Sequence, residues 1–396
     1  MASGREVVVL SGVRTAIGDY GGGLKDIAPT ELSAQVIKEA VKRARVDAKE
    51  IGACVIGNVI HTEAKDMYFS RVAALKGGLP EDSTALTVNR LCGSGMQAIV
   101  SASQMIVLGD IDTAVGGGAE SMSRGGYLMP TLRWGQRMSD GSVVDMMVGA
   151  LTDPFDTVHM GITAEAIAEK WKITREQQDE FSVESHRRAI NAIEKGYFKD
   201  QILPIELKTR KGTTVFDRDE HPRADATLEG MAKLRAAFKK DGSVTAGNAS
   251  GINDGAAAVV LMERAAAEKK GLKPMARLVS YGIAGVDPKI MGIGPVPACR
   301  KALEKAGLKV EQMDVIESNE AFAVQALAVS CDLKLDPKKT NPNGGAVGLG
   351  HPIGATGAVL TVKALYELQR MGGQYALVTM CIGGGQGIAA VFERLQ

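Results

Sequence analysis

Hydrophobic and polar positions follow the same order near both ends of the chain. Near the N-terminus, the apolar run "REVVVLSG" precedes "ELSAQVIKEAVKRA", in which apolar residues recur every three or four positions, and the apolar run "IGACVIGNV" follows. These patterns predict a buried strand, an amphipathic helix and a second buried strand. From residue 275 onward the order recurs as "MARLVSYG", "PACRKALEKAG" with Pro297 at its start, and "MDVIESNEAF". Both ends therefore show an α/β pattern.

The recurrence extends to two longer segments. Residues 92–118, "CGSGMQAIVSASQMIVLGDIDTAVGGG", contain a polar residue, glycines, an apolar helix, a glycine break and a strand that ends in three glycines. Residues 351–385 have the same order. The chain is therefore predicted to be a duplicated α/β unit, with Cys92 and His351 at equivalent junctions. A pseudo-twofold pairing of the two halves would bring these side chains to one site.

The middle of the chain has a different amino-acid composition. Residues 121–245 are charged and helix-rich and include the basic run "KTRKG", after which "TAGNASGINDGAAAVVLME" restores the glycine, alanine and valine content of the first half. This change indicates an inserted loop domain, a kind of segment that often covers a ligand. The predicted domains are an N-terminal domain of residues 1–121 and 252–273, a loop domain of residues 122–251 and a C-terminal domain of residues 274–396.

Length and charge narrow the class of protein. A chain of 396 residues predicts two or three domains. Its 47 basic and 46 acidic residues nearly cancel, so neither nucleic acid nor a membrane is an expected partner. The apolar run before Arg14 is too short for a secretory signal, and a cytoplasmic protein is expected. The charge-free residues 372–392 are long enough for a membrane span, but their glycines and glutamines favour two buried strands about a glycine turn.

The cysteines are far apart and lack a C-x-x-C pair, so neither a disulfide framework nor a metal site is expected. Cys92 stands out because it follows a strand-like run and precedes glycines and a helix. One interpretation is a small buried residue beside a turn. The other is a nucleophile, since the glycines allow close approach and a helix N-terminus favours a thiolate. Cys54, Cys299 and Cys331 have only strand or helix context and are interpreted as packing or surface residues.

Three further patterns accompany "CGSG": Asn319 in "NEAF", His351 in "GHPIGATG" and Cys381 in "CIGGG". Together with "HMGITAE" and "NASGINDGAAA", they resemble the thiolase family along the whole chain, and most closely its biosynthetic branch of acetyl-CoA acetyltransferases and β-ketothiolases. The resemblance implies a duplicated, layered α/β/α/β/α fold with an inserted helix-rich loop domain. It also implies an acyltransferase that reversibly converts two acetyl-CoA molecules to acetoacetyl-CoA and CoA, by a ping-pong mechanism through an acyl-Cys92 intermediate.

The resemblance implies a role for each catalytic position. Cys92 would accept the acyl group, because a thioester exchanges with a thioester at little cost, and His351 would take the Cys92 proton. Cys381 would remove the α-proton of the incoming acetyl-CoA. Asn319, holding a water, and His351 would stabilise the enolate, while the backbone N–H groups of Cys92 and Gly383 would stabilise the tetrahedral intermediate. Taken singly, His351 could be a turn residue, Asn319 a helix cap and Cys381 plain core.

The resemblance also implies that the loop domain binds CoA. The positions that match CoA contacts are His159, Met160, Arg223, Ala246 and Ser250, with Ala321 and Phe322 near the pantetheine. Arg223 and "KTRKG" carry positive charge suited to the CoA phosphates, although such residues could also form a solvated basic face. Acetyl-CoA, β-ketoacyl-CoA and CoA are thus the expected partners, with no cofactor and no metal, and family members suggest a homotetramer built as a dimer of dimers. His61 and His186 are histidines that could approach the substrate.

Two stretches depart from the short-chain enzymes of the family. "HTEAKDMYFSRVAAL", residues 61–75, stands where those enzymes carry a "GQxPARQA"-like stretch, and "MSRGGY" replaces a "MSRAPY"-like turn. In the family these places lie near the subunit contact and the acyl pocket. We therefore expect 3-ketovaleryl-CoA to be a second substrate, since one methylene changes binding in a pocket by only about 1–3 kcal/mol.

Three alternatives stay open from the sequence. A degradative 3-ketoacyl-CoA thiolase of fatty-acid oxidation is the first, and "CGSG" in place of "CSSG", with "HMG" at 159–161, argues against it. A ketoacyl-carrier-protein synthase would carry a second histidine or an asparagine in place of Cys381. A non-catalytic CoA- or lipid-binding protein on the same scaffold would not need the intact set of two cysteines, asparagine and histidine.

Overall fold

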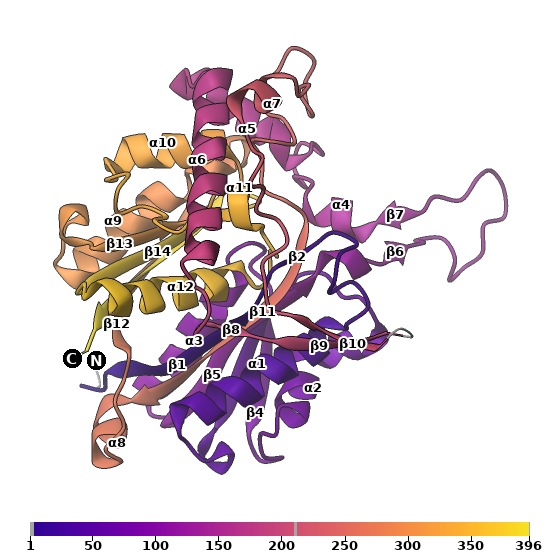
Figure 1. Cartoon of the computed structure of the whole chain (residues 1–396). Helices are drawn as coiled ribbons and strands as arrows, with labels where there is room; N and C mark the ends of the chain where they lie inside the picture. The colour runs from indigo at the N-terminus through magenta and orange to yellow at the C-terminus, as the bar shows by residue number, and fades with distance from the viewer. Residues whose placement is uncertain (1–3, 210–211, 396) are drawn as a thin grey trace.

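Most strands of the protein join one mixed sheet, which runs through both halves of the chain (Figure 1). The computed structural model describes residues 4–209 and 212–395. Along the sheet the strands follow the order β13 (Val315–Ser318), β14 (Tyr375–Ile382), β15 (Gln386–Arg394), β12 (Ala276–Gly285), β1 (Val7–Thr15), β11 (Asn253–Glu263), β5 (Thr113–Ser121), β3 (Ala53–Gly57) and β4 (Thr84–Val88). Two short strands, β2 (Gly18–Asp19) and β8 (Ile202–Leu203), pair with β11 and β1.

The two halves of this sheet repeat one pairing pattern. In the first half, β3 is parallel to β5, and β5, β11 and β1 follow one another antiparallel. In the second half, β13 is parallel to β14, and β14, β15 and β12 follow one another antiparallel. The halves meet where Val8 and Val9 of β1 pair with Arg277 and Ala276 of β12. The duplicated unit predicted from the sequence is confirmed.

Two helices lie between the halves. α3 (Ser94–Leu108) and α12 (Thr356–Met371) contact each other, and each contacts strands of both halves. α1 (Pro29–Ala44) covers the opposite face of the first half, beside α2 (Phe69–Lys76), and α9 (Pro295–Ala306) covers that of the second. The order helix, sheet, helix pair, sheet, helix confirms the layered α/β/α/β/α fold.

Two sequence expectations can be compared with these layers, and one long apolar helix is explained by them. Residues 372–392 form β14 and β15, joined by Gly384 and Gly385, whose φ angles of +80° and +85° suit a glycine turn. The stretch Leu91–Leu108 is long and apolar enough to span a membrane by composition, but here it is the central helix, so burial explains its hydropathy. α9 begins at Pro295, two positions before the expected Pro297, because both prolines fit the first turn.

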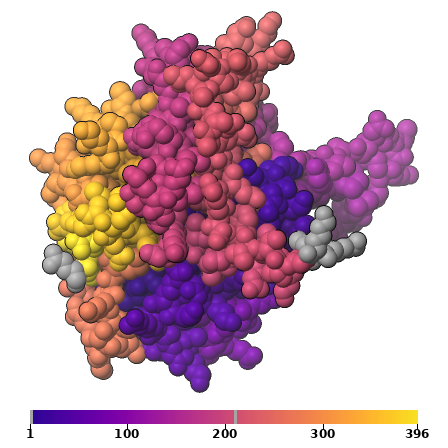
Figure 2. Space-filling view, viewed as in Figure 1, coloured from indigo at the N-terminus to yellow at the C-terminus, as the bar shows by residue number. Residues whose placement is uncertain are grey.

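The inserted segment carries α4 (Met146–Ala150), α5 (Met160–Trp171), α6 (Arg175–Glu194) and α7 (Leu228–Ala232). It also forms two hairpins, β6 (Tyr127–Leu128) with β7 (Val144–Asp145), and β9 (Ile205–Thr209) with β10 (Gly212–Phe216). Figure 2 shows this segment lying across the junction of the two halves, while the β6–β7 hairpin projects away from the body. The charged helices expected there are α5 and α6. The domain limits proposed from the sequence stay a prediction.

The remaining helices are α8 (Arg264–Lys269) after β11, α10 (Ala323–Leu333) after β13, and α11 (Ala346–Leu349) just before α12.

A buried ion pair connects β1 to the inserted segment. Arg14 Nη1 and Nη2 donate to Asp219 Oδ1 and Oδ2 at 2.7 and 3.0 Å. Both side chains are fully buried. Separating the two side chains would leave a buried charge without its partner, which is strongly destabilising. The ion pair therefore holds the inserted segment in place against β1.

Candidate active site

A cavity of about 480 Å³ lies where the inserted segment meets both halves of the fold. Residues expected at the site from the sequence line it together, although they come from distant parts of the chain. They are Cys92, His159, Met160, Arg223, Ala246, Ser250, Ala321, Phe322, His351 and Gly383. Cys381 and Asn319 are fully buried outside this lining. The fold therefore brings ten of the twelve expected positions to one cavity, while their roles stay predictions.

Cys92 occupies a strained turn between β4 and α3. The preceding residue, Leu91, has a φ of +44°, a left-handed conformation that costs energy for a residue with a side chain. Ser94 holds the turn, because its Oγ donates to Leu91 O at 2.6 Å and its N–H donates to the same carbonyl at 2.9 Å. A Cβ on Gly93 would lie 2.6 Å from Ile382 Cδ1, so this glycine lets the turn approach the end of β14.

The Cys92 thiol is neutral at rest. Burial raises its pKa to about 11, although the backbone N–H groups of Gly383 and of Cys92 itself hydrogen-bond to the sulfur and lower the pKa. Both amides therefore lie close to the atom that would carry the acyl group. A Cβ on Gly383 would lie 3.0 Å from Met160 Cε and 3.2 Å from Leu91 Cδ1, so glycine keeps the approach to this N–H open.

His351 is held on three sides at the end of α11. Its backbone N–H donates to Asn253 Oδ1 at 2.8 Å, and its Nδ1 lies 2.6 Å from Thr356 Oγ1. Its Nε2 lies 3.4 Å from Asn319 Nδ2. Burial lowers the pKa of His351 to about 4, which keeps the imidazole neutral near pH 7. His351 and Cys92 line the same cavity, where a neutral imidazole can act as a general base and a neutral thiol as an acid.

Asn319 and Cys381 are fully buried next to residues that line the cavity. Asn319 Oδ1 is buried and accepts no hydrogen bond from the residues that the structure describes. Cys381 lies on β14 opposite Gly387 of β15. Burial is the main cause of its raised pKa, and the charge of a Cys92 thiolate would raise it further, which means that the two sulfurs share one electrostatic environment.

An aromatic cluster lines the part of the cavity made by the inserted segment. His159 stacks on Phe238 with 4.5 Å between ring centroids and 14° between planes, and Phe238 meets Phe322 edge to face at 6.2 Å. A Cβ on Gly161 would overlap the Phe238 ring, so the glycine of "HMG" makes room for it. Sequence reasoning missed Phe238, and this glycine is the signal that could have indicated a ring packed there.

A polar chain joins the cavity to the His351 loop. His221 Nδ1 lies 2.6 Å from Asp19 Oδ1, and Asn253 Nδ2 donates to the same oxygen at 3.1 Å. Asn253 Oδ1 in turn accepts the His351 N–H. His221 and Asp19 line the cavity, yet no sequence motif marked them. They come from segments about 200 residues apart, and only the fold brings them together.

The two other histidines lie outside the cavity lining. His61 is exposed on the surface. His186 is buried behind His221, with 6.1 Å between the ring centroids, and its Nδ1 accepts the Arg223 N–H at 3.2 Å. The sequence left the roles of His61 and His186 open. Neither lines the described cavity, whereas His221 does. Of the basic run "KTRKG", Lys208 lies on β9 away from the cavity, and Arg210 and Lys211 lie outside the described residues.

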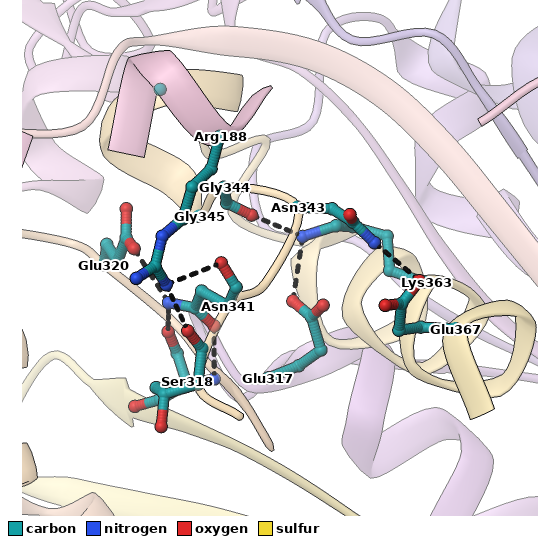
Figure 3. A network of polar contacts seen from close by, with 12 residues as sticks. Arg188, Glu317, Ser318, Glu320, Asn341, Asn343, Gly344, Gly345, Lys363 and Glu367 are labelled. Carbon is teal, nitrogen blue, oxygen red and sulfur yellow. Dashed lines mark hydrogen bonds and ion pairs between the residues drawn. The ribbon is translucent and has the colours of Figure 1, made fainter. Parts of the chain in front are cut away.

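A buried network of polar contacts supports the loops that carry Asn319 and His351 (Figure 3). Glu320, next to Asn319, accepts hydrogen bonds from Ser185 Oγ at 2.6 Å and from Asn341 Nδ2 at 2.8 Å. Ser185 Oγ also accepts the backbone N–H groups of Gly345 and Gly348, in the segment that leads to His351. A single serine of α6 therefore links the Asn319 loop to the His351 loop.

Lys363 extends this network from α12. Its Nζ donates to Glu317 Oε2 at 2.8 Å and to Gly344 O at 2.7 Å, and both side chains are buried. Burial raises the pKa of Glu317 to about 6, although the Lys363 charge lowers it. This pair ties α12, which follows His351, to β13, which precedes Asn319.

Comparisons with known proteins agree with this arrangement. Residues 7–265 match the model of the thiolase N-terminal domain, and residues 272–394 match that of the thiolase C-terminal domain. The chain is 66% identical to the beta-ketothiolase BktB of Cupriavidus necator, over 99% of this chain and 100% of the relative. The acetyl-CoA acetyltransferase of Bacillus anthracis has a similar structure, with a TM-score of 0.97, 50% identity and 99% of each chain covered.

Human mitochondrial 3-ketoacyl-CoA thiolase in complex with CoA also has a TM-score of 0.97, with 44% identity and 100% of each chain covered. The fold alone therefore does not separate the branches, whereas sequence identity is highest, among these three, to the bacterial beta-ketothiolase. Because both domain models match in order over nearly the whole chain, the protein belongs to the thiolase family.

Proposed function

We propose that this thiolase is a biosynthetic enzyme that joins two acetyl-CoA molecules to acetoacetyl-CoA and CoA, reversibly, and that also accepts 3-ketovaleryl-CoA. The observation that carries the proposal is the meeting of Cys92, His351 and the Gly383 N–H in one cavity, with Cys381 and Asn319 buried beside it. The identity to a beta-ketothiolase and to acetyl-CoA acetyltransferases supports the substrate class. CoA and its thioesters are the substrates, with no cofactor or metal required.

The first half-reaction follows from the two neutral groups. The Cys92 proton passes to His351 Nε2, and the thiolate attacks the acyl carbonyl carbon. The resulting oxyanion accepts hydrogen bonds from the Cys92 and Gly383 N–H groups, which lie close to the sulfur. When the bond to the CoA sulfur breaks, Cys381 protonates this sulfur. The acyl group is then on Cys92, and Cys381 is a thiolate.

The second half-reaction uses the base made by the first. The Cys381 thiolate takes an α-proton from the incoming acetyl-CoA, and the raised pKa of this thiol makes its thiolate a strong base. The enolate oxygen accepts a hydrogen bond from His351 Nε2–H and from a water bound at Asn319 Oδ1. The enolate carbon attacks the acyl-Cys92 carbonyl, the Cys92 thiolate leaves, and His351 returns its proton. Every proton is then back at its starting atom.

The end of the cavity near Cys92, where the acyl chain of the substrate would lie, supports a preference for short acyl chains. Met122, Leu151 and Ile353 line it near Cys92. A Cβ on Gly125, in the unusual "MSRGGY" turn, would lie 2.9 Å from Met147 Cβ, so the glycine lets Met147 pack beside this end. No residue of the divergent stretch 61–75 is in the described lining, so these apolar side chains set the chain length within the protomer.

We also infer that the enzyme acts in the cytoplasm as a homotetramer, a dimer of dimers. Two exposed features support assembly. The projecting β6–β7 hairpin carries Leu132, Trp134 and Met138 with exposures of 67%, 86% and 84%, and the edge strand β4 exposes Leu86. Apolar surface of this kind marks contacts between proteins. Sedimentation velocity tests the assembly, and a monomer at micromolar concentration would refute it.

Steady-state thiolysis tests the reaction itself. With CoA as acceptor, acetoacetyl-CoA should be cleaved fastest, 3-ketovaleryl-CoA at more than a hundredth of that rate, and 3-ketopalmitoyl-CoA far more slowly. Efficient cleavage of the long chain would favour the degradative branch. The absence of any CoA-dependent cleavage by folded protein would instead favour a binding protein on the same scaffold.

A further inference from the structure

Thr356, the first residue of α12, lies directly behind the His351 ring. Its Oγ1 is 2.6 Å from His351 Nδ1 and 2.9 Å from the carbonyl oxygen of Pro352. The side chain is buried, and Thr356 does not line the cavity. Its hydroxyl therefore touches the imidazole and the backbone but has no access to a substrate.

The Thr356 hydroxyl has a single hydrogen, and the direction in which this hydrogen points decides which ring nitrogen of His351 is protonated. A carbonyl oxygen has no hydrogen to give, so the contact with Pro352 O uses the single hydrogen of the Thr356 hydroxyl. The oxygen is then an acceptor toward His351 Nδ1, and this ring nitrogen carries the hydrogen. Because burial keeps the ring neutral, Nε2 holds a lone pair.

The other side of the ring agrees with this assignment. Nε2 lies 3.4 Å from Asn319 Nδ2, an amide nitrogen that carries only donor hydrogens. In the opposite arrangement, Thr356 would donate to Nδ1, and Nε2–H would face the N–H group of Asn319. Two donors would then point at each other in a buried site, which is unfavourable.

We propose that Thr356 is a positioning residue that holds His351 in the Nδ1–H form, so that Nε2 keeps the lone pair that takes the Cys92 proton. The inference rests on the proposed function and specifies how its base is prepared. In the reaction, Nε2 gains the proton that the Cys92 sulfur loses, the ring becomes a cation, and Nδ1–H stays bonded to Thr356. Ring orientation and proton location are thus fixed before substrate arrives.

Two matched substitutions separate the hydroxyl from the shape of the side chain. Thr356→Val replaces the hydroxyl by a methyl group of similar size, and Thr356→Ser keeps the hydroxyl. In Thr356→Val, kcat for acetoacetyl-CoA thiolysis should fall by at least about tenfold, because a misplaced proton disables general-base catalysis. KM should stay within about twofold, since the residue is outside the cavity. Thr356→Ser should recover most of kcat.

A direct readout is nitrogen-15 NMR of protein labelled at histidine, with His351→Gln used to assign the signals. The wild type and Thr356→Ser should show a protonated Nδ1 and an unprotonated Nε2 at His351, and Thr356→Val should lose this preference. A protonated Nε2 in the wild type would overturn the inference, even if the valine variant fails to fold. Equal losses of kcat in the serine and valine variants would overturn it too. Wild-type protein without thiolysis but with the Nδ1–H signal would refute the function and leave the assignment of the ring intact.

Discussion

Gly95 and Gly357 hold the same place in two different helices, and each lies against the backbone of the other. A Cβ on Gly95 would be 2.7 Å from the Ala358 nitrogen, and one on Gly357 would overlap the Met96 nitrogen. Both are the second residue of their helix, α3 or α12. The two helices therefore touch through their first turns, which begin just after Cys92 and His351. This contact sets how close Cys92 and His351, the proposed nucleophile and its proposed base, can come.

Gly357→Ala should separate these helices. Backbone atoms cannot move aside as a flexible side chain can, so we expect the free energy of unfolding to drop by about 1–3 kcal/mol, as in other overpacked cores. The rate of Cys92 acylation should fall as well, because the two junctions move apart. Urea unfolding and acylation kinetics measure the two effects.

Gly149→Ala is the matched control for this substitution. Gly149 lies in α4 with open space around its Cα, so alanine there should leave stability unchanged or raise it by up to about 1 kcal/mol. An unfolding midpoint of Gly357→Ala equal to that of the wild type would show that the helix contact is not close enough to matter.

The duplicated fold could be predicted from the sequence because its signal is local. Each half repeats a strand, an apolar helix and a glycine-ended strand, and these periods can be read without knowledge of tertiary contacts. Cys92 and His351 could be paired for the same reason. The motif resemblance then supplied Asn319, Cys381, Gly383 and the seven CoA-side positions. Gly383 and those seven positions line one cavity with Cys92 and His351, whereas Asn319 and Cys381 are buried outside its lining.

The supporting residues could not be predicted in this way. Asn253 and Asp19 act through side-chain contacts between segments 234 residues apart, and nothing in their neighbourhood marks them as partners. Phe238 lies in an irregular stretch and meets His159 only because the inserted segment folds back. His186 is on the same face of the fold as His221, and the sequence does not tell which of the two reaches the cavity.

Glu120 is a buried carboxylate that joins the end of β5 to the His351 loop. One oxygen accepts from Asn58 Nδ2 and the Ile60 N–H, and the other from the N–H groups of Val59 and Gly354. Burial raises its pKa to about 8, while the backbone N–H groups oppose the rise. A pKa of about 8 would place a proton on Glu120 at neutral pH, but a proton on either oxygen would face the N–H donors that these oxygens accept. The hydrogen-bond geometry is the stronger argument, and it fits a carboxylate.

Glu120→Gln should therefore weaken the protein despite its similar shape. The amide NH₂ must replace one oxygen and face two donors, so the free energy of unfolding should drop by at least about 1–3 kcal/mol. Glu268→Gln, at an exposed residue bonded to Arg264, is the control and should change it by less than about 0.5 kcal/mol. Chemical denaturation compares them, and equal stabilities for the two variants would contradict the assignment.

Acid should destabilise the protein through His186. Burial, with the charges of His221 and Arg223, lowers its pKa to about 4. The unfolded chain, with a histidine pKa near 6.5, therefore binds a proton that the folded state refuses as the pH falls from about 6.5 to 4. The stabilisation is complete above about pH 6.5 and is lost toward pH 4, with a loss of up to about 3 kcal/mol from this residue.

His186→Asn removes this titration and keeps an acceptor for the Arg223 N–H. The free energy of unfolding, measured in urea between pH 4.5 and 7, should thus depend less steeply on pH than in the wild type. His61→Asn makes the same change at an exposed position and should keep the wild-type slope. Identical slopes for the wild type and His186→Asn would exclude this histidine as a source of acid sensitivity.

Arg223 should contribute to CoA binding by charge. It is exposed at the rim of the cavity, so its attraction to phosphate is screened by salt. Arg223→Ala should raise KM for CoA by up to about fivefold at low ionic strength, and the difference should shrink at high salt. Arg218→Ala, an exposed arginine outside this cavity, is the control. An unchanged KM at both salt concentrations would place the nucleotide elsewhere.

Cys92 is proposed to carry the acyl group and Cys381 to act as the base for the α-proton. Intact-mass spectrometry of protein quenched after exposure to acetyl-CoA separates these two roles. The wild type and Cys54→Ala should gain one acetyl group, and Cys92→Ala should gain none. Cys381→Ala should still be acetylated at Cys92, although more slowly because CoA must then leave without the Cys381 proton. It should form no acetoacetyl-CoA, because carbon–carbon bond formation needs the second base. A folded Cys381→Ala protein that stays unacetylated, or a Cys92→Ala protein that carries the acetyl group on Cys381, would contradict the account.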